Sequence, residues 1–365
     1  MRRPIPPRST VVIKIGSSSL TRGRPGLDAD ALRAVVAQVV ALRDLGHPTV
    51  LVTSAAVAAG LPALGLVGRP TDVPGLQAAA AVGQSRLMQA YTEAFDAHDV
   101  TVGQVLLTRN VLADRDQYLH TRQAFERLLA LGVVPIVNEN DTVAIEELRL
   151  GDNDRLAAMV GHLVGAGLLL LLTDTSGILS ADPRTDVGAT LLGAVEHTDA
   201  VLDALTRGGS GPLGSGGIST KIAAARMAAW SGVPTVIAPS DAADVASLAV
   251  SGGDIGTWVE PRSQRLPARK LWIAFGQPSE GRIVVDAGAR TAIARGGSSL
   301  LPVGITSVEG DFRAGAAAEV AGPDGHLIAK GMSRFDAAEL RRRAGHRSEH
   351  GEVAIHRDDM IVLAV

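Results

Sequence analysis

The sequence predicts an α/β domain with a largely parallel sheet covered by helices on both faces, followed by a small β-rich domain. Three observations lead to this prediction. Up to about residue 260, short apolar runs typical of strands alternate with longer runs of helical periodicity. The strand-like runs are continuously apolar, as buried parallel strands are. After Glu260, short alternating segments separated by Gly and Pro turns take over.

The elements of the first domain follow one another in a regular order. The first long helix is expected to open at Asp28 and to close at Gly46, and an Ala-rich helical region reaches His98. The strand-like runs are VVIKI (11–15), TVLVT (49–53), VGQVLLT (102–108), VVPIV (133–137), LLLLLT (168–173) and VPTVIA (233–238). Further helices are expected over residues 117–131, 154–165 and 219–231. A chain of this pattern connects its parallel strands through helices.

The pattern of the sequence changes after Glu260. PRSQRLPARK (261–270) is interpreted as a linker. Beyond it, short strands are expected in GRIVVD, GITSVEG, AEVAGPDG, HLIAKG and EVAIHRDDMIVLAV. We therefore expect a first domain over residues 1–262, a linker over 263–279 and a β-rich domain over 280–365, which is large enough to fold alone.

Composition and charge restrict the function. The formal net charge of −3 argues against a general electrostatic nucleic-acid binder. The chain has no cysteine, which excludes disulfides, thiolate nucleophiles and cysteine-based zinc sites. MRRPIPPRST at the N-terminus lacks the apolar core of a signal peptide, and LLLLL (168–172) is far shorter than a bilayer span. We therefore expect a cytoplasmic protein.

Small, hydroxyl or acidic residues follow four of the predicted strands. They are GSSS (16–19), SAAVAAG (54–60), NEND (138–141) and TDTSG (173–177). Because ligands of parallel α/β sheets bind beyond the carboxyl ends of the strands, we expect one composite site there. For any single loop, the alternative is that such residues only turn the chain and cap the next helix.

The glycine-rich segment GGSGPLGSGGISTK (208–221) is the strongest candidate for phosphate binding. Its glycines allow close backbone approach, and Lys221 stands at the start of a predicted helix, whose free N–H groups attract anions. The segment is no Walker A loop, which needs Gly-Lys-Ser/Thr, and it lacks the third glycine of a dinucleotide fingerprint. The alternative is a flexible surface loop.

Lysine is rare in this chain, because only four of its 35 basic residues are lysines. The predicted first domain has two of them, Lys14 and Lys221, and both adjoin Gly/Ser-rich turns. A compact ammonium group fits between phosphate oxygens where a planar guanidinium does not. The pair therefore indicates phosphate contacts, with chance placement as the alternative for either lysine alone.

HRSEH (346–350) fits the H-x-x-E-H pattern of some zinc proteases. That chemistry needs both histidines on one helical face, whereas Gly345 just before them is a typical helix stop. We therefore expect no zinc site, and no residue is predicted to be a metal ligand.

Taken together, these motifs resemble a known family. VVIKIGSSSL, VTSAAVAAG, AAVGQSRLMQ, VGQVLLTR, VVPIVNENDTVA, GDNDRLAA, LLLLTDTSGI and GSGGISTK occur in the order and spacing of glutamate 5-kinases, members of the amino acid kinase superfamily. The tail, from GRIVVDAGARTAIARGGSSLLPVGI to EVAIHRDDMIV, resembles the PUA domain of many bacterial members. The resemblance implies the amino acid kinase fold, a three-layer sandwich with a mainly parallel central sheet, plus a small β-rich PUA-like domain.

The resemblance also implies an activity. It is the ATP-dependent phosphorylation of the γ-carboxylate of L-glutamate to γ-glutamyl phosphate, the first step of proline biosynthesis, with Mg²⁺ accompanying ATP. The family further suggests a homo-oligomer, a dimer or tetramer. It also suggests handover of the product to glutamyl-phosphate reductase, proline as a feedback inhibitor, and no membrane.

The family pattern assigns roles to individual residues. Lys14 and Lys221 flank the transferred phosphoryl group, and Asp154 orients them. The glutamate-binding positions are Ser54, Asn138, Asp141 and Asn153. The nucleotide-binding positions are Lys14, Gly16, Ser17, Thr173, Asp174, Ser215, Gly216, Gly217, Ile218, Ser219, Thr220 and Lys221. NEND and GDND (151–154) are then expected to line two sides of one pocket, and the loop TVAIEELRL (142–150) joins them.

One position departs from the family pattern, and two alternatives stay open. The family usually has glycine where Ala55 follows Ser54, so the methyl group of Ala55 lies where a ligand would approach the backbone.

A kinase for acetylglutamate, aspartate or carbamate is the first alternative function. The second is an RNA-binding regulator that uses the tail, where ELRRRAGHR (339–347) is a basic helix-like stretch; a solvated helix face is the simpler interpretation of it.

Overall fold

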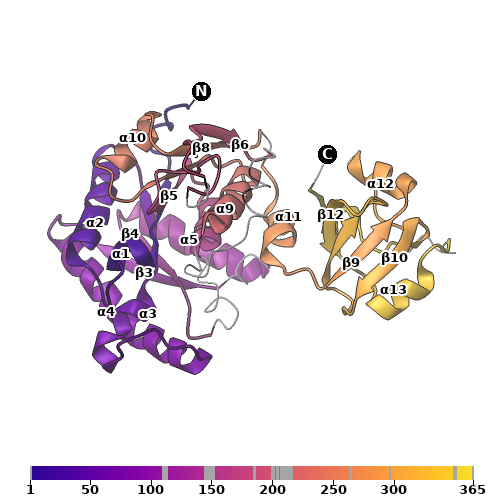
Figure 1. The fold of residues 1–365 in the computed structure, drawn as a ribbon, viewed down its shortest axis with the longest axis horizontal. Helices are drawn as coiled ribbons and strands as arrows, with labels where there is room; N and C mark the ends of the chain where they lie inside the picture. Colours follow the sequence, from indigo (N-terminus) through magenta and orange to yellow (C-terminus); the bar gives the residue numbers. More distant parts are fainter. Residues whose placement is uncertain are drawn as a thin grey trace. The chain divides into compact units, whose positions relative to one another are not determined.

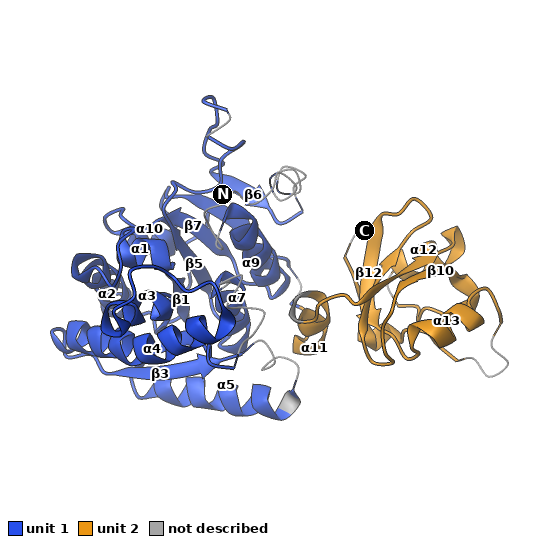
Figure 2. Cartoon of the chain, turned by 60° about the horizontal axis from the view of Figure 1, so that its bottom comes forward, with its two compact units in different colours: residues 1–265 blue, residues 266–365 orange. Residues whose placement is uncertain are grey.

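The chain divides into two compact units, Met1–Arg265 and Leu266–Val365 (Figure 2). The structure, a computed structural model, describes residues 2–108, 114–143, 153–183, 186–198, 202, 205, 217–263, 265–295, 297–347 and 352–363. Figure 1 labels many of their helices and strands along the chain.

The first unit is built on an eight-stranded sheet, counted over its described residues, with the order β3-β4-β2-β1-β5-β7-β8-β6. Its strands are β1 (Val11–Lys14), β2 (Thr49–Val52), β3 (Val102–Leu107), β4 (Val134–Glu139), β5 (Leu168–Thr173), β6 (Ala194–Glu196), β7 (Thr235–Pro239) and β8 (Thr257–Glu260). Every neighbouring pair is parallel except β7 and β8. The predicted mainly parallel sheet is therefore confirmed.

Helices cover both faces of this sheet (Figure 1). They are α1 (Ser17–Thr21), α2 (Ala29–Asp44), α3 (Ala56–Gly60), α4 (Val73–Asp96), α5 (Arg115–Ala130), α7 (Asn153–Leu163), α9 (Ile218–Trp230) and α10 (Val245–Ser251), with the 3₁₀ turn η1 (Pro62–Leu64). Side chains of a strand alternate between faces. Val11, Ile13 and Ile15 pack into the core formed with α2, α3, α4 and α10. Lys14 consequently points to the other face, where α7 packs on β1 and α9 packs on α7.

The predicted Ala-rich helical region consists of two helices, α3 and α4. α3 ends at Gly60, and Pro62, Gly65 and Pro70 follow before α4 begins. The two helices touch through their backbones, since a Cβ on Gly83 would lie 1.7 Å from the Ala56 carbonyl oxygen. A Cβ on Gly60 would lie 2.0 Å from the Ala79 oxygen. Glycine at both positions therefore brings α4 directly against α3.

The second unit contains a five-stranded sheet, in the order β10-β9-β11-β12-β13. Its elements are α11 (Ala268–Leu271), the π-helix η3 (Trp272–Gly276), β9 (Gly281–Val285), α12 (Ala287–Ala294), η4 (Pro302–Gly304), β10 (Ile305–Gly310), β11 (Ala317–Ala321), β12 (Leu327–Met332), α13 (Ala337–Arg343), η5 (Arg357–Asp359) and β13 (Met360–Val362). A core of its own contains Ile283, Ile293 and Leu340. In the part of the chain that the structure describes, no helix is long and apolar enough to cross a membrane.

Three basic residues of the second unit, Lys330, Arg341 and Arg343, bind groups of the same unit. Lys330 is 7% exposed and donates to the carbonyl oxygens of Ala274, at 3.3 Å, and of Gln277, which ties η3 to the sheet. On the basic helix α13, Arg341 donates to the carbonyls of Val308 and Gly310. Arg343 pairs with Glu339 and Glu352 and stacks on Phe335. These bonds favour the interpretation of α13 as a structural, solvated helix.

Candidate active site

A buried cluster of three charges lies at the carboxyl edge of the sheet. Lys14 is the last residue of the central strand β1, while Asp154 and Lys221 lie in the first turns of α7 and α9. Lys14 Nζ lies 2.6 Å from Asp154 Oδ1, and Lys221 Nζ lies 3.1 Å from Asp154 Oδ2. The three residues are 3%, 1% and 5% exposed, in that order. One carboxylate therefore bridges two ammonium groups, and the cluster carries one net positive charge.

The electrostatics of the cluster keep the carboxylate of Asp154 ionised. Burial raises the pKa of Asp154, but the charges of Lys14 and Lys221 outweigh it. Hydrogen bonds from Lys14 and Thr220 act in the same direction, and the pKa stays below its usual value. Thr220 Oγ1 donates to Asp154 Oδ2 at 2.8 Å. Asp154 is thus a fixed anion that holds both lysines in place.

A second cluster, of amides and hydroxyls, adjoins the first. Asn153, the residue before Asp154, donates from Nδ2 to Asn138 Oδ1 at 2.7 Å and to Ser54 Oγ at 3.0 Å. The same Nδ2 lies 2.5 Å from the carbonyl oxygen of Thr53. Asn138 and Asn153 are 2% and 6% exposed. Three of the four predicted glutamate-binding residues are therefore joined by hydrogen bonds.

Helix α4 supports this amide cluster from behind, through two residues that the sequence did not single out. Gln84 Oε1 accepts from Asn138 Nδ2 at 2.8 Å. Tyr91, one heptad later on the same helix face, shares a 2.8 Å hydrogen bond with Thr53 Oγ1. Tyr91 is fully buried, which raises the pKa of its hydroxyl and keeps it neutral. α4 therefore fixes Asn138 and Thr53 from one side.

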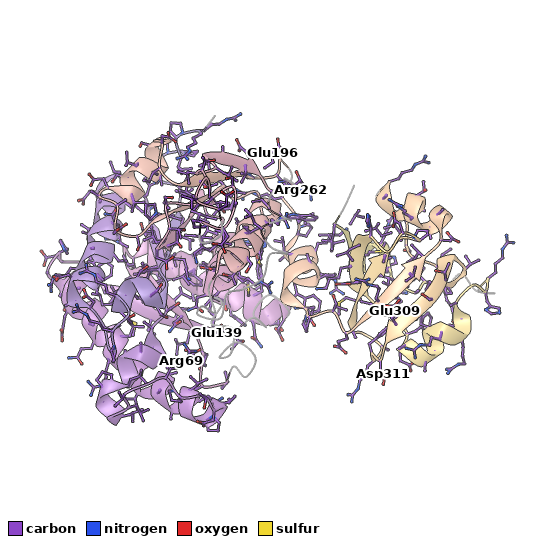
Figure 3. The ribbon with its side chains drawn as sticks, viewed as in Figure 1. Arg69, Glu139, Glu196, Arg262, Glu309 and Asp311 are labelled. Atoms are coloured by element: carbon purple, nitrogen blue, oxygen red, sulfur yellow. The ribbon has the colours of Figure 1, made fainter. Side chains whose placement is uncertain are left out.

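A cavity opens beside the amide cluster. Its lining includes all four predicted glutamate-binding residues, Ser54, Asn138, Asp141 and Asn153, and Ser17 from the phosphate side. Arg69 and Glu139, which the sequence did not single out, also line it. Figure 3 labels both residues. Glu139 lies within the motif NEND at the end of a strand, so the sequence could have indicated it as a site residue. Arg69 lies in no such motif. The rest of the predicted loop TVAIEELRL, from residue 144, lies outside the described residues.

The predicted nucleotide-binding residues lie around the lysine side of the edge. Gly16 is adjacent to Lys14, since a Cβ on it would be 3.7 Å from Lys14 Nζ. Thr173 ends β5, the neighbour of β1, and Asp174 follows it, exposed. Gly217 caps α9, whose first turn contains Ile218, Ser219, Thr220 and Lys221. Ser215 and Gly216 lie outside the described residues.

Ala55 adopts an unusual backbone conformation. Its φ of 78° and ψ of 11° lie in the left-handed region, at the N-cap of α3. That region is strained for a residue with a Cβ and suits glycine, which is the residue expected from the family pattern. Ala55 also lines the cavity. The backbone at position 55 therefore adopts a conformation typical of glycine, although the residue is alanine.

His162 lies on α7, the helix that begins with Asn153 and Asp154. Burial, with the charges of Arg265 and Arg122, lowers the pKa of His162 from 6.5 to about 4. The ring centroids of Tyr118 and His162 are 6.1 Å apart, and Nε2 is buried without a hydrogen-bond partner among the described residues. His162 is therefore held as a neutral imidazole.

This arrangement predicts a pH-dependent stability. Between pH 6.5 and about 4 the unfolded chain protonates His162 while the folded chain does not. The free energy of unfolding should therefore fall by about 3 kcal/mol as the pH falls through that range. Above pH 6.5, His162 should not change the free energy of unfolding. Urea unfolding at several pH values measures this. His162→Phe should flatten the slope, whereas exposed His98→Gln should not; equal slopes in all three proteins would contradict the prediction.

Comparison with known proteins identifies the family. Residues 9–239 match the model of the amino acid kinase family, and residues 281–352 match that of the PUA domain. Relatives named glutamate 5-kinase include one from Pelobacter propionicus, 42% identical over 97% of each chain. Another, from a Geobacter species, is 46% identical over 97% of each chain. A third, from Frankia casuarinae, is 46% identical over 97% of this chain and 96% of its own. The chain therefore belongs to the amino acid kinase family and, within it, to the glutamate 5-kinases, with a PUA domain in its second unit.

Proposed function

We propose that this protein transfers the γ-phosphoryl group of ATP to the γ-carboxylate of L-glutamate. The products are ADP and γ-glutamyl phosphate, and the reaction is the first step of proline biosynthesis. The observation that supports it most is the bridged cluster Lys14–Asp154–Lys221 beside a cavity lined by amides and carboxylates. The names of relatives that match nearly the whole chain support the same reaction.

The chemistry needs charge neutralisation more than proton transfer. A glutamate side chain is ionised at pH 7, so its oxygen attacks phosphorus without a general base. The difficulty is that a carboxylate and a phosphoryl group repel each other while they are brought into line. Lys14 and Lys221 offer two ammonium groups at one place, held by Asp154. Their charge would stabilise the transferring group and the leaving ADP oxygen.

The cavity suits the amino acid end of the substrate. Asn138 and Asn153 supply oriented amides, and Ser54 supplies a hydroxyl. Asp141 is a carboxylate in the lining, suited to the α-ammonium group. With the ammonium bound there, the γ-carboxylate would extend past Ser17 towards the lysines.

The nucleotide would bind on the other side of the lysines. Gly217 and the first turn of α9 offer backbone N–H groups to its phosphates, while Thr173 and Asp174 stand at the end of β5. Among the described residues, no group of three or more histidine, aspartate or glutamate side chains is arranged to hold a metal ion. A Mg²⁺ ion would come with ATP, bound mainly by phosphate oxygens, where it would neutralise phosphate charge.

An acceptor panel tests the proposal. With Mg²⁺ and ATP, the protein should form ADP on addition of L-glutamate. In the presence of hydroxylamine it should also form γ-glutamyl hydroxamate, the trapped acyl phosphate. N-acetyl-L-glutamate, L-aspartate and carbamate should give little ADP. Turnover of N-acetyl-L-glutamate without turnover of L-glutamate would overturn the assignment and favour another kinase of the superfamily.

We further propose the finer features that the family resemblance implies. The protein would act in the cytoplasm as a homo-oligomer, with free proline as an inhibitor and a reductase as the consumer of its labile product. Light scattering on the purified protein tests the assembly, and a monomer at assay concentrations would contradict it.

Addition of L-proline to the acceptor assay tests the inhibition, and an unchanged rate would contradict it.

A further inference from the structure

The cavity beside the lysine cluster has an unequal distribution of charge. Three charged side chains line it, Arg69, Glu139 and Asp141, and Glu139 is 4% exposed. Arg69 is the one cation among the described lining residues. Arg69 lies in the segment between η1 and α4, and Figure 3 labels it with Glu139 on the first unit. The two residues come from distant parts of the chain, and the fold brings both to the lining of this cavity.

An amino acid substrate brings three charges to this cavity. If its γ-carboxylate extends to Lys14 and Lys221, its α-ammonium and α-carboxylate remain at the outer end. Glu139 and Asp141 match the ammonium group there. The same two carboxylates repel the α-carboxylate, which lies only two bonds from the ammonium nitrogen, so that end of the cavity also needs a cation.

We infer that Arg69 binds the α-carboxylate of the amino acid substrate and so selects α-amino acids over simpler acids; this rests on the proposed function. A guanidinium group presents a planar fork of N–H donors that matches a carboxylate. Arg69 is exposed at the cavity rim, where it can meet an entering ligand.

The backbone around Arg69 is suited to holding it there. Pro70 follows directly and favours an extended conformation for Arg69. Asp72 then caps α4, accepting from the Gly75 N–H at 2.7 Å. A Cβ on Gly75 would lie 2.9 Å from Pro70 Cβ, so this segment packs closely on the start of α4. Arg69 therefore extends from an anchored segment.

The test compares substrates with and without an α-carboxylate. L-Glutamate is compared with L-isoglutamine, which carries an amide in place of the α-carboxylate, and with 4-aminobutanoate, which lacks the group. In Arg69→Gln, kcat/KM for L-glutamate should fall about tenfold to a hundredfold, mainly through KM. The kcat/KM for the other two acids and the KM for ATP should stay unchanged. Arg69→Lys should retain part of the preference.

Arg33→Gln provides the matched control, because Arg33 is an exposed arginine on α2 that pairs only at the surface with Asp30. It should behave as the unmodified protein does. Suppose that the unmodified protein phosphorylates L-glutamate and that Arg69→Gln keeps the full preference for L-glutamate over the other two acids. The role of Arg69 is then wrong, while the proposed function stands. If the unmodified protein neither binds L-glutamate by calorimetry nor phosphorylates it, the proposed function and the role of Arg69 both fall.

Discussion

Asp154→Asn should lower kcat by at least about a hundredfold. The substitution keeps the shape of the side chain but removes the anion that lies between Lys14 Nζ, at 2.6 Å, and Lys221 Nζ, at 3.1 Å. Two buried ammonium groups would then repel each other without compensation, and should move apart or lose a proton. The free energy of unfolding should fall by about 3 kcal/mol for the same reason.

Steady-state kinetics at saturating L-glutamate and ATP, with urea unfolding of the same preparations, measure both effects. Thr220→Val is the graded control, because it removes one hydrogen bond to Asp154 Oδ2 and leaves the charges. It should lower kcat far less than Asp154→Asn does. A folded Asp154→Asn protein with unchanged kcat would show that the bridge has no part in phosphoryl transfer.

Lys14→Met and Lys221→Met should each lower kcat by about a hundredfold to a thousandfold, while the KM for L-glutamate changes little. Methionine keeps the length and apolar stem of lysine but removes the ammonium group that would face the phosphoryl group. Either variant leaves Asp154 paired with the other lysine, so the fold should survive. The loss should therefore appear in turnover rather than in stability.

Lys270→Met is the matched control for these variants, since Lys270 lies in the second unit on α11. It should keep full activity. Lys221→Arg should be nearly as inactive as Lys221→Met, because a planar guanidinium cannot take the place of the compact ammonium beside Asp154. Activity close to that of the unmodified protein in both methionine variants would refute the phosphate role of the lysines.

The long elements of the fold could be predicted because their patterns are strong. Continuously apolar runs such as 168–173 and amphipathic runs such as 29–44 predict buried strands and surface helices over their whole length. Short elements gave no such signal. β6 has three residues, two of them exposed, and α1 has five, so neither produces a recognisable period. The Ala-rich helical region expected up to His98 is divided into α3 and α4, because Pro62 and Pro70 interrupt it.

The candidate site could be predicted in part, for two different reasons. Lysine scarcity and Gly/Ser-rich turns indicated Lys14 and Lys221 from the residues alone, while the family pattern indicated Asp154 and Asn153. Arg69 and Tyr91 could not be found in this way. Their roles depend on how α4 and the segment before it pack beside β2 and β4, and tertiary packing leaves no local motif in the sequence.

An oxygen-18 experiment tests directly whether the γ-carboxylate of L-glutamate attacks phosphorus. The protein is given Mg²⁺, unlabelled ATP, hydroxylamine and L-glutamate whose γ-carboxylate carries oxygen-18 in both positions. If that carboxylate attacks phosphorus, hydroxylamine displaces phosphate at the carbonyl carbon, and the phosphate keeps the bridging oxygen. Mass spectrometry should then find one labelled oxygen in each phosphate and one in each γ-glutamyl hydroxamate. Unlabelled phosphate, released without hydroxamate, would show that water attacks ATP and would contradict phosphoryl transfer to L-glutamate.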